Sequence, residues 1–421
     1  MGKREEQIAK SIIYVIINTD ENGKPIQRQT VLSRILSIFN LYWLTFQLVR
    51  EDLFRGLREF WAIKSSDYKD SFTPASAASR NKKKAPLLQP LGDMGYSGST
   101  FFRTADGAYL VKSVPRSFEN KFFKNDMLLP YADHMRANPG SLLVRITDFL
   151  ECTRGSLGTL FGLAPSHHIV MENILYGQDE KKTSSSTSVG PSGNGQDGEG
   201  EQLKKKWESW DLKPTSYFFP ERDIAGGKLT SEATKSKLAD EFEGKLYLTL
   251  DQAEDFKAQL QKDTKFLADR NAVDYSLFLV RISVDTDGDN ADGQEAGSAD
   301  LLTRVQTDGK TPVIPPAQPP FAPPGPPSWC TGISSSNGKE IYRAAVLDFF
   351  WAKHTVHAKA MTGLINTYNL VDEQGPMSVT AEADEYRQRF MKMCLDMIEV
   401  DGRMWNFEGA EATGPEASSG S

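Results

Sequence analysis

Cysteine is scarce in this chain, and long apolar runs are missing. The 421 residues include three widely separated cysteines: Cys152, Cys330 and Cys394. Their spacing excludes a disulfide scaffold and a cysteine-based zinc module, and it fits a reducing compartment. The longest apolar stretch, Ile35–Val49, contains Asn40 and Gln47. It is too short and too polar for a bilayer span, so we predict a buried helix there.

The chain also has no excess of positive charge. Its formal net charge is −7, which argues against a broad nucleic-acid interface. The opening Met-Gly-Lys-Arg-Glu-Glu is followed by a short apolar run only, so we expect no secretory signal peptide.

The composition of three segments is not that of a packed domain, and we predict these segments to be disordered. They are an insert at 177–202, an acidic and then proline-rich insert at 284–339, and a tail at 401–421. Such segments bury too little apolar surface to offset the entropy of ordering them. Together they carry a formal charge of −10, so the rest of the chain carries +3. A mildly basic folded part suits an anionic partner.

The remaining chain mixes helical and strand patterns. Apolar spacing predicts a helix around Leu53–Trp61, and the pair Thr249 and Gln252 predicts the start of another through a capping box. A last helix is expected from Tyr386 to Ile398. Strand patterns occupy 100–114, with a turn at 105–107, and also 168–175, 273–282 and 341–350. This order predicts an α+β protein with two lobes, at 1–175 and 203–400.

A glycine- and serine-rich loop precedes the first predicted hairpin. It reads Gly95-Tyr-Ser-Gly-Ser-Thr-Phe101, and Lys112 follows on the second strand. Backbone N–H groups of such a loop can approach phosphate oxygens closely, and the lysine can place an ammonium beside them. The alternative is an ordinary glycine-rich turn with a solvent-facing lysine.

Three further motifs place charged residues at strand ends. Asp211 and Lys213 lie two apart on a strand and share one face, which favours a cleft or, alternatively, a surface ion pair. Asp274 and Asp348 each stand within apolar sequence beside a predicted buried strand. Since burying an unpaired carboxylate is expensive, the two aspartates either converge on a divalent ion, split into base and metal ligand, or are capping residues.

A weakly basic stretch follows Asp348 and contains Lys353, His354, His357 and Lys359. The two histidines are three apart, but no third metal ligand is evident. An imidazole beside an anionic substrate is the better interpretation.

In this order, the motifs resemble the phosphatidylinositol phosphate kinase family. The resemblance spans roughly residues 35–400 without the inserts. Its marks are Gly95–Ser99, Lys112, Leu128–Tyr131, Val170–Asn173, Asp211–Lys213, Asp274–Leu277 and Asp348. Val170–Asn173 and Gln374–Met377 are similar to the subfamily that phosphorylates phosphatidylinositol 3-phosphate at the 5-position. The resemblance implies a two-lobed kinase-like fold, also seen in SAICAR synthase, with an antiparallel sheet in the N-lobe and a smaller mixed C-lobe.

The resemblance also implies roles for individual residues. ATP and Mg²⁺ are the implied cofactors, and Asp348 is the implied metal ligand. Asp274 would lie at the reacting hydroxyl, with Asp211 and Lys213 beside the transferred or substrate phosphate. The implied nucleotide-binding residues are Gly95, Ser97, Gly98, Ser99, Thr100, Lys112, Glu119 (which would hold Lys112), Met171 and Asn173. Lys353, His354 and Lys359 would contact the lipid.

Two departures from the family pattern favour a second hypothesis. Pro214 stands where the family has glycine, and His354 replaces the second of two adjacent lysines in a shorter loop. A weak or inactive phosphoinositide-binding scaffold is therefore the alternative to a kinase making a bisphosphate from a 4- or 3-phosphate. A soluble inositol phosphate kinase is a third possibility. Partners expected are a membrane phosphatidylinositol monophosphate, a second copy of the chain, and an SH3, WW or profilin-type domain on the proline repeats of 315–327. We expect a cytoplasmic protein, peripheral on membranes.

Overall fold

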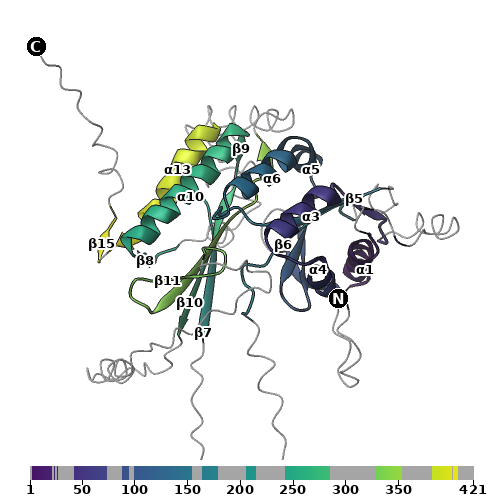
Figure 1. The fold of residues 1–421 in the computed structure, drawn as a ribbon, viewed down its shortest axis with the longest axis horizontal. Coiled ribbons are helices and arrows are strands. Elements are labelled where there is room, and N and C mark those ends of the chain that lie inside the picture. The colour runs from purple at the N-terminus through teal and green to yellow at the C-terminus, as the bar shows by residue number, and fades with distance from the viewer. Residues whose placement is uncertain are drawn as a thin grey trace, which may run out of the picture.

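The computed structural model describes twelve parts of the chain. They are residues 2–20, 23, 26, 42–73, 88–93, 99–153, 164–178, 205–214, 242–284, 328–352, 382–400 and 402–405. These residues form an α+β structure with several antiparallel sheets, as the sequence patterns predict (Figure 1).

The largest sheet is six-stranded and antiparallel throughout. Its spatial order is β1-β5-β6-β4-β3-β2. The strands are β1 (Phe46–Leu48), β2 (Leu88–Asp93), β3 (Thr100–Thr104), β4 (Tyr109–Ser113), β5 (Ile146–Cys152) and β6 (His167–Glu172). The predicted hairpin is confirmed. Gly107 supplies the positive φ of +77° that the turn between β3 and β4 requires, and Asp106 accepts hydrogen bonds from Thr104 and Ala108 across it.

A second, four-stranded sheet has the order β11-β12-β10-β7. Its strands are β7 (Lys205–Leu212), β10 (Ser276–Val284), β11 (Ile333–Ser334) and β12 (Glu340–Leu347), all paired antiparallel. Two small sheets complete the set. They pair β9 (Ala272–Val273) with β13 (Trp351–Ala352), and β8 (Leu246–Leu248) with β14 (Ile398–Val400) and β15 (Arg403–Met404).

The two larger sheets are joined by main-chain hydrogen bonds. The segment leading into β5 lies parallel to the end of β12, with Leu143 opposite Val346. The amide of Val346 donates to the carbonyl of Leu142 at 2.6 Å, and the amide of Val144 donates to the carbonyl of Val346 at 3.1 Å. This junction fixes where β4 and β12, which both carry predicted site residues, stand relative to each other.

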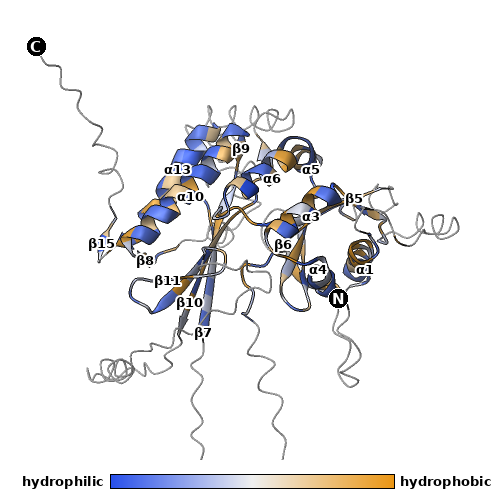
Figure 2. Cartoon of the chain, in the orientation of Figure 1, coloured by the Kyte–Doolittle hydropathy of each residue, from blue (hydrophilic) through white to orange (hydrophobic). Residues whose placement is uncertain are grey.

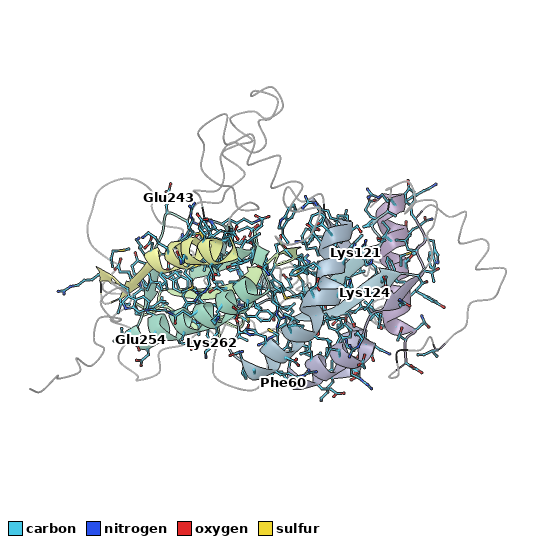
Figure 3. The ribbon with its side chains drawn as sticks, turned by 90° about the horizontal axis from the view of Figure 1, so that it is seen from above. Phe60, Lys121, Lys124, Glu243, Glu254 and Lys262 are labelled. Atoms are coloured by element: carbon cyan, nitrogen blue, oxygen red, sulfur yellow. The ribbon has the colours of Figure 1, made fainter. Side chains whose placement is uncertain are left out.

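Helices cover the sheets with amphipathic faces. They are α1 (Lys3–Ile17), α3 (Glu51–Phe60), α4 (Ser65–Asp70), α5 (Ser117–Phe122), the π-helical turn η1 (Phe123–Met127), α6 (Leu128–Ala137), α10 (Leu250–Asp269) and α13 (Ala383–Asp396). The long helices α10 and α13 lie side by side, and each shows both polar and apolar residues (Figure 2). Charged residues extend from the outer surfaces of the helices, among them Lys121 of α5 and Glu254 and Lys262 of α10 (Figure 3). Within the described chain, no helix is long and apolar enough to cross a membrane.

The predicted helices at 53–61, after Thr249 and at 386–398 are present, with bounds shifted by up to three residues. α3 matches the predicted helix, and Thr249 and Gln252 form the reciprocal capping box at the start of α10. The predicted last helix ends at Asp396, because Ile398 already belongs to β14, which pairs with β8. The helix predicted for Ile35–Val49 is wrong in its described part. Phe46–Leu48 is strand β1, whose backbone pairs with β5.

The folded chain also extends into two segments that composition assigned to disorder. Trp329 is buried, at 3% exposure, and packs on Phe256 of α10, so residues 328–339 belong to the folded part. Arg403 and Met404 form β15, an edge of the small sheet. A few apolar residues at the ends of these polar segments anchor them, and an averaged composition hides such residues. The rest of the predicted inserts, including the proline repeats, lies outside the described residues.

Candidate active site

Asp274 and Asp348 interrupt two neighbouring strand pairs. Asp274 separates β9 from β10, and Asp348 separates β12 from β13. Both residues adopt left-handed backbone conformations, with φ of +64° and +63°. Such a conformation costs a non-glycine residue roughly 1–2 kcal/mol, and strain of this kind concentrates at functional sites.

The register places the two aspartates opposite each other. Ser276 of β10 pairs with Leu347 of β12 on one side of the interruption, and Val273 of β9 pairs with Trp351 of β13 on the other. Both aspartates therefore lie at one level of an adjacent strand pair, and the strands predicted to run through 273–282 and 341–350 are each interrupted there. The paired, buried strands on both sides fix the position of this interruption in the sheet.

Two lysines reach these aspartates from different strands. Lys213, directly after β7, donates to Asp274 Oδ1 at 2.9 Å. Lys112, on β4 of the six-stranded sheet, forms an ion pair with Asp348. The second contact joins the two larger sheets through side chains, since Asp348 follows β12. The predicted solvent-facing alternative for Lys112 is excluded, because its side chain is 8% exposed.

The neighbouring ammonium and carboxylate groups stabilise each other's charged forms. Burial alone would raise the pKa of the Asp348 carboxyl, but the ammonium groups of Lys112 and Lys213 outweigh it and lower that pKa below its usual value. Burial also works against the charged form of Lys213, yet three neighbouring carboxylates raise its pKa. We therefore expect Asp348 and Lys213 to remain charged throughout the neutral pH range.

Asp211 is the third carboxylate of this group. It lies on β7 opposite Phe278, two residues before Lys213. The residue keeps contact with solvent, but protein surrounds its carboxyl group on the other sides. This burial and the negative charge of Asp348 raise the pKa of Asp211, while Lys213 opposes the shift. The carboxyl group of Asp211 therefore takes up a proton at a higher pH than that of Asp348.

Glu119 lies on α5, near the lysine that the family resemblance assigns to it. Its carboxylate accepts a hydrogen bond from Arg116 at 2.9 Å, whereas Lys112 contacts Asp348. Burial raises the pKa of Glu119 despite the neighbouring Arg116 and Lys112. The expected Glu119–Lys112 contact is thus replaced here by two other pairs, although Lys112 still acts on Glu119 electrostatically.

Met171 and Asn173 lie where β6 ends and a connecting turn begins. Met171 is buried between Leu110 of β4 and Ile146 of β5. The side-chain Nδ2 of Asn173 donates to the carbonyl of Gly107 at 2.7 Å, and its Oδ1 accepts from the backbone amide of Leu175 at 3.1 Å. Asn173 therefore shapes the connection and ties it to the β3–β4 turn.

The glycine- and serine-rich loop is described only at its end. Ser99 is buried, and Thr100 begins β3 with its amide donating to Ser113 Oγ at 2.8 Å. The remaining predicted residues of the loop and of the basic stretch lie outside the described residues: Gly95, Ser97, Gly98, Lys353, His354 and Lys359.

A protein-only metal site is not formed by the described residues. No group of three or more histidine, cysteine, aspartate or glutamate side chains among them is arranged to hold an ion. Mg²⁺, however, commonly uses one or two carboxylates together with substrate phosphates and water. Asp348, ionised because its pKa is lowered, fits that pattern as a protein ligand.

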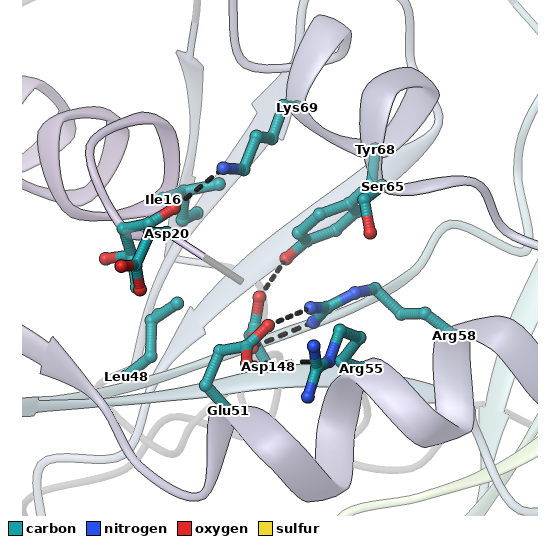
Figure 4. A pocket seen from close by; sticks show the side chains of 11 residues that line it. Ile16, Asp20, Leu48, Glu51, Arg55, Arg58, Ser65, Tyr68, Lys69 and Asp148 are labelled. Carbon is teal, nitrogen blue, oxygen red and sulfur yellow. Dashed lines mark hydrogen bonds and ion pairs between the residues drawn. The ribbon is translucent and has the colours of Figure 1, made fainter. Parts of the chain in front are cut away.

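A second charged cluster lies away from the two aspartates. Figure 4 shows it in a pocket between α3, α4 and the neighbouring strands. Arg58 of α3 contacts Glu51 at 2.9 Å and Asp148 of β5 at 3.0 Å, and the Tyr68 hydroxyl donates to Asp148 at 2.7 Å. Burial raises the pKa of both carboxyl groups. This cluster fixes α3 and α4 to β5.

Sequence reasoning missed a buried charged network at the junction of the sheets. Arg343 of β12 is fully buried, and Arg145 and Glu172 near it are 5% and 3% exposed. The signal was present, because Arg343 stands within the otherwise apolar stretch of β12, as Asp274 and Asp348 stand beside theirs. The same rule, that a buried charge needs compensation, applies to a basic residue.

Comparison with known proteins agrees with this arrangement. The sequence model of the family described as Phosphatidylinositol-4-phosphate 5-Kinase matches residues 82–397. A phosphatidylinositol 4-phosphate 5-kinase of Plasmodium falciparum is 35% identical over 147 residues, which cover 35% of this chain and 8% of that protein. A probable phosphatidylinositol phosphate kinase of Dictyostelium discoideum is 26% identical over 226 residues, covering 54% of this chain and 26% of that protein.

These matches span a small part of each relative's own length, but the family match covers most of this chain. It includes every residue that the structure gathers around Asp274 and Asp348. The chain belongs to the phosphatidylinositol phosphate kinase family.

Proposed function

We propose that this chain transfers the γ-phosphoryl group of ATP to a ring hydroxyl of a phosphatidylinositol monophosphate, giving a bisphosphate. The 4-phosphate and the 3-phosphate are the candidate acceptors, each phosphorylated at the 5-position. The observation that carries the proposal is the meeting of Lys112 with Asp348 across the two larger sheets, beside the Lys213–Asp274 pair. Family membership supports it.

In this proposal the two larger sheets are the cores of two kinase lobes. The six-stranded sheet belongs to the N-terminal lobe, within residues 1–175, and the four-stranded sheet to the C-terminal lobe, within 203–400. ATP would lie between them, with the loop from Gly95 to Thr100 over its phosphates and the Met171–Asn173 connection beside its base. Glu119 would pair with Lys112 when the phosphates draw Lys112 away from Asp348.

Charge balance supports a requirement for a divalent ion. Lys112 and Lys213 contribute two positive charges, and the three aspartates contribute three negative charges when ionised. A triphosphate entering this group meets a net negative site. Mg²⁺ held by Asp348 would neutralise part of the phosphate charge. Lys112 and Lys213 would offset the remainder from two sides of the site.

Asp274 is proposed to orient the acceptor hydroxyl. It lies at the strand interruption, and its carboxylate accepts from Lys213, so one lysine can contact both this carboxylate and the incoming phosphate. Because phosphoryl transfer depends mainly on positioning and charge neutralisation, a carboxylate that accepts the hydroxyl proton is sufficient as a base. Asp211 would tune Lys213 from its other side.

The lipid would be presented at a membrane surface. We propose a cytoplasmic, peripheral protein whose basic stretch with Lys353, His354 and Lys359 contacts the anionic headgroup. Each basic side chain near an anionic surface contributes about 1 kcal/mol.

The test is transfer of radiolabelled phosphate from ATP to vesicles, each carrying one phosphatidylinositol monophosphate. The catalytic control is Asp348→Asn. The matched control is Asp396→Asn, a change at an exposed aspartate of α13. We expect product with one lipid, lost in Asp348→Asn and kept in Asp396→Asn.

The same assay separates the alternatives. Product with free inositol phosphates and none with vesicles would indicate a soluble-substrate kinase. Vesicle binding with no transfer to any acceptor would contradict the proposal and favour the scaffold, which Pro214 and the proline repeats of 315–327 support.

A further inference from the structure

Arg343 occupies an unusual place for an arginine, because it is 0% exposed in the middle of β12. Its guanidinium donates to main-chain carbonyl oxygens of two separate segments. Nε donates to Thr331 at 3.2 Å, while Nη1 donates to Ile174 at 3.0 Å and to Tyr176 at 2.8 Å. Two of these three carbonyls belong to the turn that follows β6.

The surroundings of Arg343 compensate its charge. The guanidinium stands over the ring of Trp207 on β7, 5.4 Å from the ring centroid, a cation–π contact. The buried carboxyl of Glu172, at the end of β6, is the nearby acid on which both Arg145 and Arg343 act. Burial raises its pKa, and the two arginines oppose that shift. Glu172 also accepts a hydrogen bond from the amide of Arg145 at 3.0 Å.

A lysine cannot reproduce this arrangement. The planar guanidinium offers donors in a fixed fork, whereas an ammonium is a compact point charge. Removing such donors leaves buried carbonyls without partners, which is costly. The contacts of Arg343 are therefore specific to arginine.

The location of these contacts gives them a consequence for nucleotide binding. Arg343 is on the strand that ends directly before Asp348, and its partners Ile174 and Tyr176 directly follow Asn173. The side chain thus fixes the distance between the connection proposed to hold the nucleotide base and the aspartate proposed to hold the metal and phosphates.

We propose that Arg343 is a positioning residue for ATP, acting through the 174–176 turn. This inference rests on the proposed function. It assigns Arg343 to the recognition of the nucleotide and not to that of the lipid. Substitution of Arg343 should therefore change the KM for ATP more than the KM for the lipid.

The test compares Arg343→Lys with Arg281→Lys in steady-state kinetics. Arg281 is a partly buried arginine of the adjacent strand β10, and it binds the side chain of Glu208. For Arg343→Lys we expect the KM for ATP to rise about tenfold, the loss of one or two charge-assisted hydrogen bonds. The kcat and the KM for lipid should change less than about twofold, since those steps use other residues. Arg281→Lys should change none of the three.

A second measurement does not depend on activity. Hydrogen exchange of the amides in 173–178 should become faster in Arg343→Lys than in Arg281→Lys, because the turn loses its anchor. If Arg343→Lys fails to fold, Trp207→Phe weakens the cation–π contact instead and should raise the KM for ATP about twofold.

Three results have distinct meanings. An unchanged KM for ATP in an active Arg343→Lys enzyme would overturn the role of Arg343. An equal loss for ATP and lipid would do the same, because it would indicate a general structural defect. If the wild-type chain binds no ATP, the proposed function fails, and with it the role in nucleotide binding, whatever the exchange rates show.

Discussion

Within the described residues, two clusters of paired acidic and basic side chains differ in how they are built. The cluster around Asp274 and Asp348 draws its members from both larger sheets, and two of them have positive φ. The cluster around Arg58 and Asp148 lies within one region, on regular helices and a strand, and its acids are buried. Ion pairing by itself therefore does not distinguish the proposed reaction site from a structural support. The proposed site differs in that its paired aspartates themselves have positive φ and its members come from both larger sheets.

The largest expected effect follows from removing the charge of Asp348. Asp348→Asn should lower kcat/KM about 1000-fold, because the proposed metal ligand and the charged partner of Lys112 are lost together. Stability should fall less than in the buried Arg58 cluster, because asparagine tolerates the left-handed conformation and the Asp348 side chain of the lost ion pair is 33% exposed. Phosphate transfer and urea unfolding measure the two effects. A variant that keeps a tenth of the activity would contradict the assignment of the metal to Asp348.

The structural cluster should show the opposite pattern. Arg58→Leu leaves Glu51 and Asp148 buried without their cation, and we expect a loss of about 3 kcal/mol in the free energy of unfolding. Per folded molecule, kcat should be unchanged. Urea unfolding with parallel activity assays tests this. The matched change Arg55→Leu, at a more exposed arginine 3.9 Å from Glu51, should cost less than about 1 kcal/mol. Equal costs for the two arginines would argue against the buried support.

A third prediction concerns His168, which belongs to neither cluster. Its ring is fully buried on β6 against Phe46, and this burial lowers its pKa to about 3. The unfolded chain binds a proton below about pH 6.5, whereas the folded chain does not. Stability must therefore fall as the pH drops below that value. Between pH 7.5 and pH 5 the loss from this group is about 2 kcal/mol.

The measurement is urea unfolding of the wild type and of His168→Phe at both pH values. The wild type should lose about 2 kcal/mol more than the variant on acidification. The same pH dependence in both proteins would show that His168 is protonated in the folded state. The difference between the two proteins gives the pH dependence of stability that comes from burying one neutral imidazole. The ion-paired charges of the two clusters contribute equally to both proteins and cancel.

The smallest expected effect isolates the backbone strain at Asp274, within the proposed reaction site. Asp274→Gly should be more stable than Asp274→Ala by about 1 kcal/mol, because glycine adopts positive φ without steric cost. At Glu254, an exposed position of α10, the order should reverse, since alanine is favoured in a helix by about 1 kcal/mol. Thermal unfolding of the four variants provides the comparison. A more stable Asp274→Ala would mean that the site is not strained.

The sequence was sufficient to predict the local pieces of this structure. Strand alternation predicted β3 and β4, helical spacing predicted α3, and apolar runs predicted β10 and β12, although not their interruption at Asp274 and Asp348. These features depend on neighbouring residues, so a single sequence contains them. The capping box of α10 is a further example.

The sequence did not predict the pairings between distant segments. The junction of Leu142–Val144 with β12 and the contacts of Arg343 with the turn after β6 join residues far apart in the chain. The helix predicted through Phe46 is a strand because β5 offers a hydrogen-bonding edge, which outweighs local propensity. Glu119 pairs with Arg116, and Lys112 pairs with Asp348, where the resemblance implied a Glu119–Lys112 pair. The Lys112–Asp348 pair likewise joins side chains from separate elements.

The hydrogen bonds between the Leu142–Val144 segment and Val346 also restrict how the two larger sheets can move. Pulling the sheets apart along this line would break backbone bonds that lie between buried residues. Rotation about the line keeps these hydrogen bonds, and the Lys112–Asp348 ion pair, a second link between the two sheets, opposes it. The two sheets are thus held by unlike contacts, of which the ion pair is the one that an incoming charged substrate can exchange.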